Sequence, residues 1–538
     1  MKHSKKLASL LLALVMALSL AVTAFADEST TYSITINNST AGHTYEAYQI
    51  FTGDLATNEA GNKVLSNIVW GSGVSEAGQT ALGDAAAKTE TLKTEADAKA
   101  FAKAVAPYLT TAAGSANTVT DGKYVISGLA AGYYLVKDQD GSLAGDADAY
   151  TEYIIKVVSD TTATPKSSVP TVEKKVKDIN DSTDDAMTDW QDSADYDIGD
   201  SVPFQLKATL ADNVSAYTTY KVVFHDTLSK GLTLNATYGE GENANVVTSG
   251  VTVKVGDADA DKAKNFVITA VKNTDGTTTL TVSCDDVIKA LGAGNSSVIT
   301  VEYTAKLNEN AVLGSAGNPN KVKLEYSNNP NKSEAGSNET GNTPEDTVIV
   351  FTYKTIINKV NSENQALPGA EFTLEKKIFG DDPTTDKAET EYWKAITVVK
   401  NDKGTTFTFS GLDDGDYRLT ETKTPAGYNT IAPIYFVIEA THDATADTPA
   451  LTVLKAYLTD ENGNKKTEVK DGETVNIDLG TVDLTAGSIT TTVVNKSGSE
   501  LPSTGGIGTT IFYVLGGVLV LAAVVLLVTK KRMSGAEK

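Results

Sequence analysis

The chain has 538 residues, a net charge of −23, four histidines and a single cysteine. So acidic a chain lacks the Lys and Arg clusters that neutralise phosphates, and nucleic acid is not an expected partner. One cysteine, Cys284, excludes an intrachain disulfide framework, and with four histidines it also argues against a His/Cys zinc site.

The N-terminus has the parts of a secretory signal peptide. Lys2, Lys5 and Lys6 precede an apolar stretch, and small residues lead up to Ala26. This order predicts cleavage between Ala26 and Asp27 and export of the rest of the chain. A first transmembrane helix is the alternative, and it is disfavoured because the stretch is short and the cleavage site is good.

Short alternating runs of apolar and polar residues, separated by turn residues, fill the exported body. The clearest runs are 32–36, 251–255, 278–282 and 406–409. Alternation with period two predicts β-strands arranged in sandwich domains. Residues 84–109 are the exception, because they are rich in Ala, Lys and Glu with Leu92, Phe101 and Val105 as apolar markers. They predict a helical insertion in the first domain.

Two stretches rich in proline, glycine and polar residues divide the body, one around residue 165 and one at 329–345. After them comes an apolar run that is long enough to cross a hydrocarbon core of about 30 Å, followed by basic residues. The expected divisions are a signal peptide (1–26), an N-terminal domain (27–165), a middle domain (166–345), a C-terminal domain (346–497), a short motif (501–505), a transmembrane helix (507–529) and a basic cytoplasmic tail (530–538).

Polar residues continue apolar strand faces at three places in the middle domain. Because side chains alternate along a strand, Lys174 shares a face with two valines, and Asp226 follows a valine and a phenylalanine. Asn328 ends a face of three apolar side chains. A lysine on such a face costs free energy unless it is paired or neutral. Lys175 and Asn329 are the alternatives, which a β-bulge would select.

The C-terminal domain repeats this pattern, with Lys359 in its first strand, Glu421 in mid-domain and Asn495 in its last strand. An amine made neutral by an apolar site can attack an Asn carbonyl, while a protonated acid polarises that carbonyl and ammonia leaves. Each set can thus form a Lys–Asn isopeptide bond, with Asp226 and Glu421 each acting once as the catalytic acid. Taken alone, each lysine is more simply a strand residue whose charged end reaches water.

Several of these motifs resemble those of Gram-positive pilins. Residues 417–428 resemble the pilin E-box, and with residues 367–372 they resemble the B-type repeat domain of collagen adhesins. The segments around Lys174, Asp226 and Asn328 are similar to the isopeptide-forming second domain of major (backbone) pilins. The resemblance implies a mostly β fold of tandem immunoglobulin-like sandwiches of the collagen-adhesin A and B types, with the helical insertion in the first domain and a C-terminal transmembrane helix.

The C-terminal region resembles the sorting signal of sortase substrates. Its motif is Leu501-Pro502-Ser503-Thr504-Gly505. The resemblance implies that a class C sortase cuts between Thr504 and Gly505 and joins Thr504 to a lysine of another subunit. Lys166 is the candidate, because Pro165 precedes it as in the pilin motif, although Thr164 replaces the usual tyrosine.

The first domain departs from this family pattern. Its first predicted strand has no lysine, and Lys137 stands where the E-box glutamate would be. We therefore expect no isopeptide bond there, and we expect this domain to resist heat and protease least.

The expected function is the major structural subunit of a wall-anchored surface pilus that supports adhesion. The expected partners are other copies of the chain, a class C pilus sortase, a housekeeping sortase, minor tip and basal pilins, peptidoglycan and host receptors. The C-terminal helix would hold the precursor in the membrane. No cofactor is predicted and no metal ligand is assigned. A calcium site among the Asp and Asn loops stays open, because such a site would have no readable spacing in the sequence.

Two other functions compete with this interpretation. A monomeric wall-anchored adhesin that binds host matrix or glycans would keep the sorting motif but would have no use for Lys166. An enzyme is not expected, because the sequence shows no Ser/His/Asp motif, phosphate loop or metal cluster.

Overall fold

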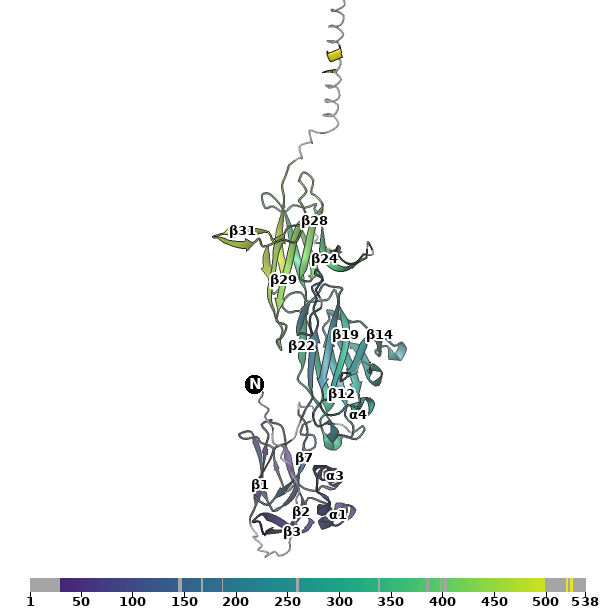
Figure 1. Ribbon diagram of the computed structural model, residues 1–538, viewed down its shortest axis with the longest axis vertical. Helices are drawn as coiled ribbons and strands as arrows, with labels where there is room; N and C mark the ends of the chain where they lie inside the picture. The colour runs from purple at the N-terminus through teal and green to yellow at the C-terminus, as the bar shows by residue number, and fades with distance from the viewer. Residues whose placement is uncertain are drawn as a thin grey trace, which may run out of the picture.

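The computed structural model describes residues 30–498, except 144–147, 166–167, 186, 258–260, 337–338, 384, 386, 397–398 and 401–403, together with 519–520 and 523–525. Strands dominate, and three modules follow one another along an elongated molecule (Figure 1). The mostly β fold class is confirmed. In the described part of the chain, no helix has both the length and the apolar character needed to span a membrane.

The N-terminal module consists of two sheets and a helical layer. One sheet has the strand order β5-β1-β8, and the other has the order β3-β2-β6-β7, with β4 beside β2. Its elements are β1 (Tyr32–Asn37), β2 (Tyr45–Thr57), β3 (Lys63–Trp70), α1 (Glu76–Leu82), α2 (Ala85–Thr91), α3 (Glu95–Val105), β4 (Gly114–Ala116), β5 (Lys123–Leu129), β6 (Gly132–Asp138), β7 (Glu152–Val157) and β8 (Thr161–Ala163).

The second sheet of this module is covered on both faces. Ile34 and Tyr124 belong to the core between the sheets, and Phe51 and Phe101 belong to a separate core beneath the helices. The predicted helical insertion is confirmed, but as two helices. Thr94 interrupts it because its side chain caps α3 in a reciprocal capping box with Asp97.

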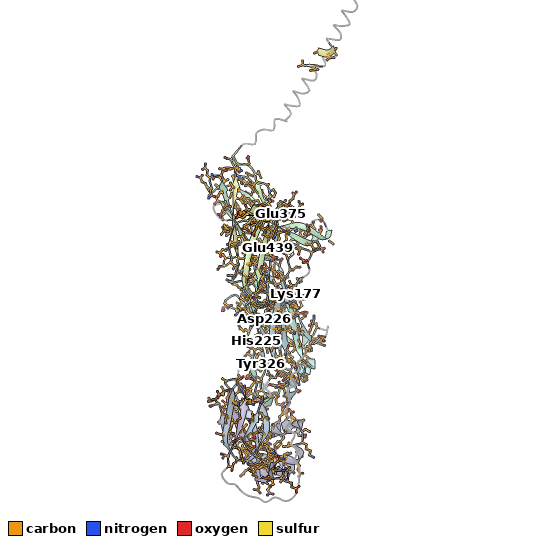
Figure 2. All side chains as sticks on the ribbon, turned by 60° about the vertical axis from the view of Figure 1, so that its left-hand side comes forward. Lys177, His225, Asp226, Tyr326, Glu375 and Glu439 are labelled. Atoms are coloured by element: carbon orange, nitrogen blue, oxygen red, sulfur yellow. The ribbon has the colours of Figure 1, made fainter. Side chains whose placement is uncertain are left out.

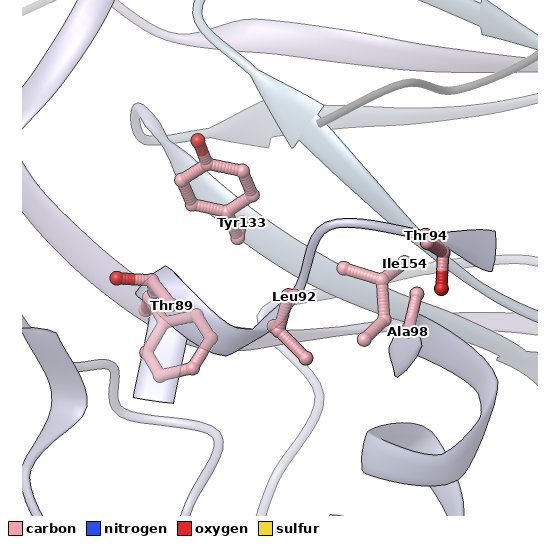
Figure 3. Close-up of a pocket in the computed structure, with 7 residues that line it drawn as sticks. Thr89, Leu92, Thr94, Ala98, Tyr133 and Ile154 are labelled. Carbon is pink, nitrogen blue, oxygen red and sulfur yellow. The ribbon is translucent and has the colours of Figure 1, made fainter. Parts of the chain in front are cut away.

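A small cavity lies in this second core, beneath the helices. It has a volume of about 30 Å³, and Leu92, Tyr133 and Ile154 are among the residues that line it (Figure 3). A water molecule needs about 10–15 Å³ of such space and a cavity that binds benzene has about 150 Å³, so this cavity is too small for an organic ligand.

The middle module is a sandwich of two sheets around one large core. The first sheet has the order β10-β22-β20-β12-β18-β17 with β21 beside β20, and the second has the order β13-β19-β11-β9 with β16 beside β19. Its elements are β9 (Thr171–Val176), β10 (Ser193–Asp195), β11 (Ser201–Thr209), β12 (Val222–Leu228), β13 (Leu232–Leu234), β14 (Thr237–Tyr238), β15 (Val247–Ser249), β16 (Val251–Val255), β17 (Val267–Lys272), β18 (Thr278–Cys284), α4 (Val287–Leu291), β19 (Val298–Leu307), β20 (Asn318–Ser327), β21 (Thr340–Asn342) and β22 (Asp346–Phe351).

The C-terminal module is a second sandwich, with strand orders β26-β27-β23-β34-β33 and β25-β24-β28-β29-β30, and β31 and β32 form a separate two-stranded sheet. Its first and last long strands, β23 and β34, lie side by side and parallel. Its elements are β23 (Tyr353–Asn361), β24 (Glu371–Asp382), β25 (Lys387–Ile396), β26 (Val399–Lys400), β27 (Thr406–Leu412), β28 (Gly415–Lys423), β29 (Ile434–His442), β30 (Leu451–Thr459), β31 (Thr467–Lys470), β32 (Glu473–Asn476), β33 (Thr481–Asp483) and β34 (Ser488–Asn495).

A buried histidine lies between two carboxylates in the N-terminal module. Nδ1 of His43 is 2.7 Å from Oδ1 of Asp138, and its Nε2 is 3.0 Å from Oδ2 of Asp148. Burial opposes protonation of the ring, but the hydrogen bonds and charges of the two carboxylates outweigh it and raise the pKa of His43 from 6.5 to about 9.

This ion pair makes the stability of the N-terminal module depend on pH. A pKa that is higher in the folded state stabilises the fold fully below pH 6.5, and this contribution is lost as the pH rises through about 9. We expect calorimetry of residues 27–498 to show the melting temperature of this module falling over that interval. The fall should disappear in His43→Gln and persist in His225→Gln, and an unchanged fall in His43→Gln would contradict this assignment.

Candidate functional site

Lys174 and Asp226 meet in the core of the middle module. They lie on strands β9 and β12 of the two opposed sheets, and neither side chain is exposed. Lys174 Nζ donates a hydrogen bond of 2.5 Å to Asp226 Oδ1. Figure 2 shows Asp226 next to His225, within the middle module and below Lys177. The structure thus brings together the predicted lysine and the predicted acid.

Tyr303 and Asn320, which sequence analysis did not identify, extend this cluster. The Tyr303 hydroxyl accepts a hydrogen bond of 3.1 Å from Lys174 Nζ and donates one to Asp226 Oδ2. Asn320 is fully buried, and its Nδ2 donates to the same hydroxyl at 2.8 Å. One phenol therefore connects an amine, a carboxyl group and an amide.

Asn328, the predicted amide partner of Lys174, lies elsewhere. Its Nδ2 donates to the carbonyl oxygens of Leu143, at 3.1 Å, and Asp148, at 3.2 Å, in the N-terminal module. The amide that joins the cluster around Lys174 is therefore Asn320, whereas the sequence led us to expect Asn328.

The register of β20 explains the error. Asp226 lies opposite Val322, and Leu228 lies opposite Asn320. Asn320 lies on β20 and Asn328 follows its last residue, an even number of positions away, so the alternation of side chains cannot distinguish them. Asn320 is one side-chain step from Val322, whereas Asn328 is three steps away in the other direction, or roughly 20 Å along a strand.

The two neighbouring residues that sequence analysis left open also lie outside the cluster. Lys175 is half-buried and pairs with Asp192. Asn329 donates from Nδ2 to Glu339 at 3.1 Å and accepts a hydrogen bond from the backbone N–H of Asn331 at 2.9 Å. Of the two lysines, only Lys174 contacts Asp226.

Burial sets the protonation tendencies of the cluster. It lowers the pKa of the Lys174 amine, although the Asp226 charge opposes this shift. It also raises the pKa of Asp226 and raises that of Tyr303 well above its usual value. Both shifts of the pair favour a neutral amine next to a protonated acid, which is the state in which an amine can attack an amide carbonyl.

The C-terminal module brings together all three of its predicted residues. Lys359, Glu421 and Asn495 are buried. Lys359 Nζ donates to the Val493 carbonyl oxygen at 3.1 Å, and Asn495 Nδ2 donates to the two oxygens of Glu421 at 2.9 and 3.0 Å. Burial lowers the pKa of Lys359 despite the attraction of Glu421. Amine, acid and amide again lie in one apolar region.

The N-terminal module has no comparable set in its described part, where no lysine is buried. Lys137 Nζ forms a partly exposed ion pair of 2.7 Å with Asp140. The predicted cleavage site at Ala26 and Asp27, the candidate Lys166 and the motif from Leu501 to Gly505 lie outside the described residues, as does most of the predicted transmembrane segment.

Three segments of the chain match known families. Residues 198–330 match the Gram-positive pilin backbone subunit 2, Cna-B-like domain. Residues 354–450 match the prealbumin-like fold domain, and residues 493–534 match the LPXTG cell wall anchor motif. The first two matches include Asp226, Asn320, Lys359 and Glu421.

Similar proteins occur in Streptococcus pyogenes serotype M6. The chain is 27% identical over 417 residues to the trypsin-resistant surface T6 protein. The matched region covers 69% of this chain and 70% of that protein. It also resembles the solved structure of the T6 backbone pilin of the same serotype, described as modular with three domains. The TM-score is 0.52 at 19% identity, over 88% of this chain and 100% of that chain, so this likeness shows the fold.

Proposed function

This chain is a Gram-positive backbone pilin with an LPXTG cell wall anchor, and from that identity we propose how its subunits are joined and how each is cross-linked internally. As a pilin it is a structural subunit of a cell-wall-anchored surface pilus. A class C sortase joins Thr504 of one subunit to Lys166 of the next. A housekeeping sortase then attaches the last subunit, or a minor basal pilin, to peptidoglycan.

The joining step is an amide transfer. The sortase thiolate attacks the Thr504 carbonyl, the bond to Gly505 breaks, and Thr504 remains on the enzyme as a thioester. Lys166 Nζ attacks this thioester, an amide forms and the thiolate leaves. Support comes from the position of Lys166 in a linker, since β8 ends at Ala163 and β9 begins at Thr171. Before cleavage, the apolar segment 507–529 holds the precursor in the membrane.

Within each subunit, Lys174 is joined to Asn320 and Lys359 to Asn495. The neutral lysine Nζ attacks the Asn Cγ, and the protonated acid gives its proton to the departing Nδ2. The resulting carboxylate takes a proton from the lysine nitrogen, and ammonia leaves as the isopeptide amide forms. Asp226 and Glu421 are the acids, and Tyr303 relays the proton between Asp226 and Asn320. The observation that carries this assignment is the hydrogen-bonded chain from Lys174 and Asp226 through Tyr303 to Asn320.

In such a fibre the covalent path between Lys166 and Thr504 runs through the middle and C-terminal modules. These are the two modules with buried Lys–acid–Asn sets. The N-terminal module precedes Lys166 and is therefore outside this path, where it is free to contact a neighbouring subunit, a minor pilin or a host receptor.

Replacing Lys166 tests the joining step. In the native host, Lys166→Ala should abolish the high-molecular-weight ladder on blots of wall extracts while the monomer remains, because the attacking amine is gone. Lys289→Ala, at an exposed lysine of α4, serves as the control and should leave the ladder intact. A normal ladder in Lys166→Ala would rule out this lysine, and absence of any ladder from the wild type would favour a monomeric wall-anchored adhesin.

Intact mass tests the internal bonds. Each bond releases one ammonia, about 17 Da, so residues 27–498 should weigh about 34 Da less than their calculated mass. Asn320→Ala and Asn495→Ala should each reduce this deficit to about 17 Da, because each removes one leaving group.

Asn328→Ala is the matched control for the mass measurement, because it removes an equally buried asparagine just beyond the end of the same strand. It should keep the full deficit. A deficit that is lost in Asn328→Ala and kept in Asn320→Ala would restore the pairing expected from sequence.

A further inference from the structure

A hairpin of strands β31 and β32 projects from the side of the C-terminal module (Figure 1). Its two-residue turn, Asp471 and Gly472, has φ angles of 51° and 86°, which suit the right-handed twist of the paired strands. Residues 467–475 are all exposed. An isolated two-stranded hairpin is at best marginally stable in water, so this one would gain stability from a partner.

Strand β30 holds the base of the hairpin in place. The backbone N–H of Lys466 donates to the Leu458 carbonyl oxygen at 2.8 Å, and the backbone N–H of Leu458 donates to the Ile477 carbonyl oxygen at 2.9 Å. Lys465 Nζ lies 3.8 Å from the centre of the Tyr457 ring. The hairpin therefore leaves the module in a defined direction, as an arm that a neighbouring molecule can meet.

The two faces of the hairpin differ in charge. On one face, Lys470 lies opposite Glu473 and forms an ion pair with Glu468. On the other face, Val469 lies opposite Thr474, and neither is charged. Val469 is 77% exposed, more than any other large apolar side chain that the structure describes. An uncharged face with an exposed valine, next to open strand edges, is suited to contact with another protein strand.

The proposed pilus linkage brings a second copy of the chain to this hairpin. Because β23 begins at the joint with the middle module and β34 runs parallel to it, Asn495 lies at the far end of the C-terminal module. Nine residues lead from there to Thr504, and they span at most roughly 30 Å. Thr504 is joined to Lys166, between the N-terminal and middle modules of the next subunit. The N-terminal module extends away from the middle module (Figure 1), so it points back along the C-terminal module of the previous subunit.

We propose that the β31–β32 hairpin of one subunit docks on the N-terminal module of the next, an inference that rests on the proposed Lys166–Thr504 linkage. The N-terminal module offers two strands at sheet edges that each carry an exposed valine, β3 with Val69 and β5 with Val125. Pairing of the hairpin with such an edge satisfies backbone groups of both partners. The contact would hold in place the one module that lies outside the covalent path of the fibre.

Photo-cross-linking of pili from the native host tests this contact, with p-benzoylphenylalanine in place of Val469. We expect cross-linked peptides that join residue 469 to residues 30–165. These regions lie at opposite ends of one subunit, so such a product connects two copies (Figure 1). The same replacement at Val267, an exposed valine of the middle module, is the control and should give no product with residues 30–165. Monomer that also carries Lys166→Ala should give none either.

Val469→Cys adds a measurement with a small side chain. The native Cys284 is buried, so a maleimide should react with the new cysteine alone. We expect this reaction to be at least about fivefold slower in pili than in monomer, because a buried cysteine is inert. Val267→Cys should react equally in both.

The proposal is overturned if, in pili with a normal ladder, residue 469 is cross-linked only to other modules, or if Val469→Cys reacts as fast as in monomer. If the probe at residue 469 forms no cross-link, the reaction rate of Val469→Cys decides. Absence of a ladder from the wild type would instead refute the joining step, and with it this docking.

Discussion

A lysine amine enclosed in an apolar core constrains how the middle module packs. Lys174 Nζ lies between two sheets, where an unpaired ammonium would cost several kcal/mol. Asp226 and Tyr303 satisfy it from the opposite sheet and from β19. A slip of β9 by one residue would turn Lys174 out of the core and leave this polar pair buried without it. The hydrogen bonds of this amine thus fix how the two sheets face each other.

Strand β20, which contributes Asn320 to this cluster, also connects the middle module to its neighbour. Just beyond the end of β20, Asn328 contacts the N-terminal module, where the Asn328 carbonyl oxygen accepts a hydrogen bond of 2.8 Å from the backbone N–H of Tyr150. At the other end of the middle module, β22 ends at Phe351 and β23 of the C-terminal module begins at Tyr353. A displacement of β20 and β22 would therefore shift the contacts of the middle module with both the N-terminal and the C-terminal module.

Strand phase was sufficient to identify part of this site from the sequence. Lys174 and Asp226 each share a face with core residues, and both are fully buried. Phase could not choose between Asn320 and Asn328, because it repeats every second residue and carries no information about which residue lies opposite. Tyr303 gave no signal, since a tyrosine between Val301 and Ala305 on one face is what an ordinary core strand contains. Buried Lys376 also gave no signal in the sequence. The carboxylates that surround it, Asp181, Asp197 and Asp413, lie far from it along the chain.

The parallel pairing of β23 with β34 determines how the C-terminal module bears tension. The chain enters β23 at Tyr353 and leaves β34 at Asn495, and these positions lie at opposite ends of the shared ladder. A pull on the two ends therefore slides one strand along the other, and all the hydrogen bonds between them resist at once. An antiparallel pair loaded at adjacent ends would open one hydrogen bond at a time, like a zip. The parallel pairing of these two strands alone makes the module resist tension by shear, even without a covalent bond between them.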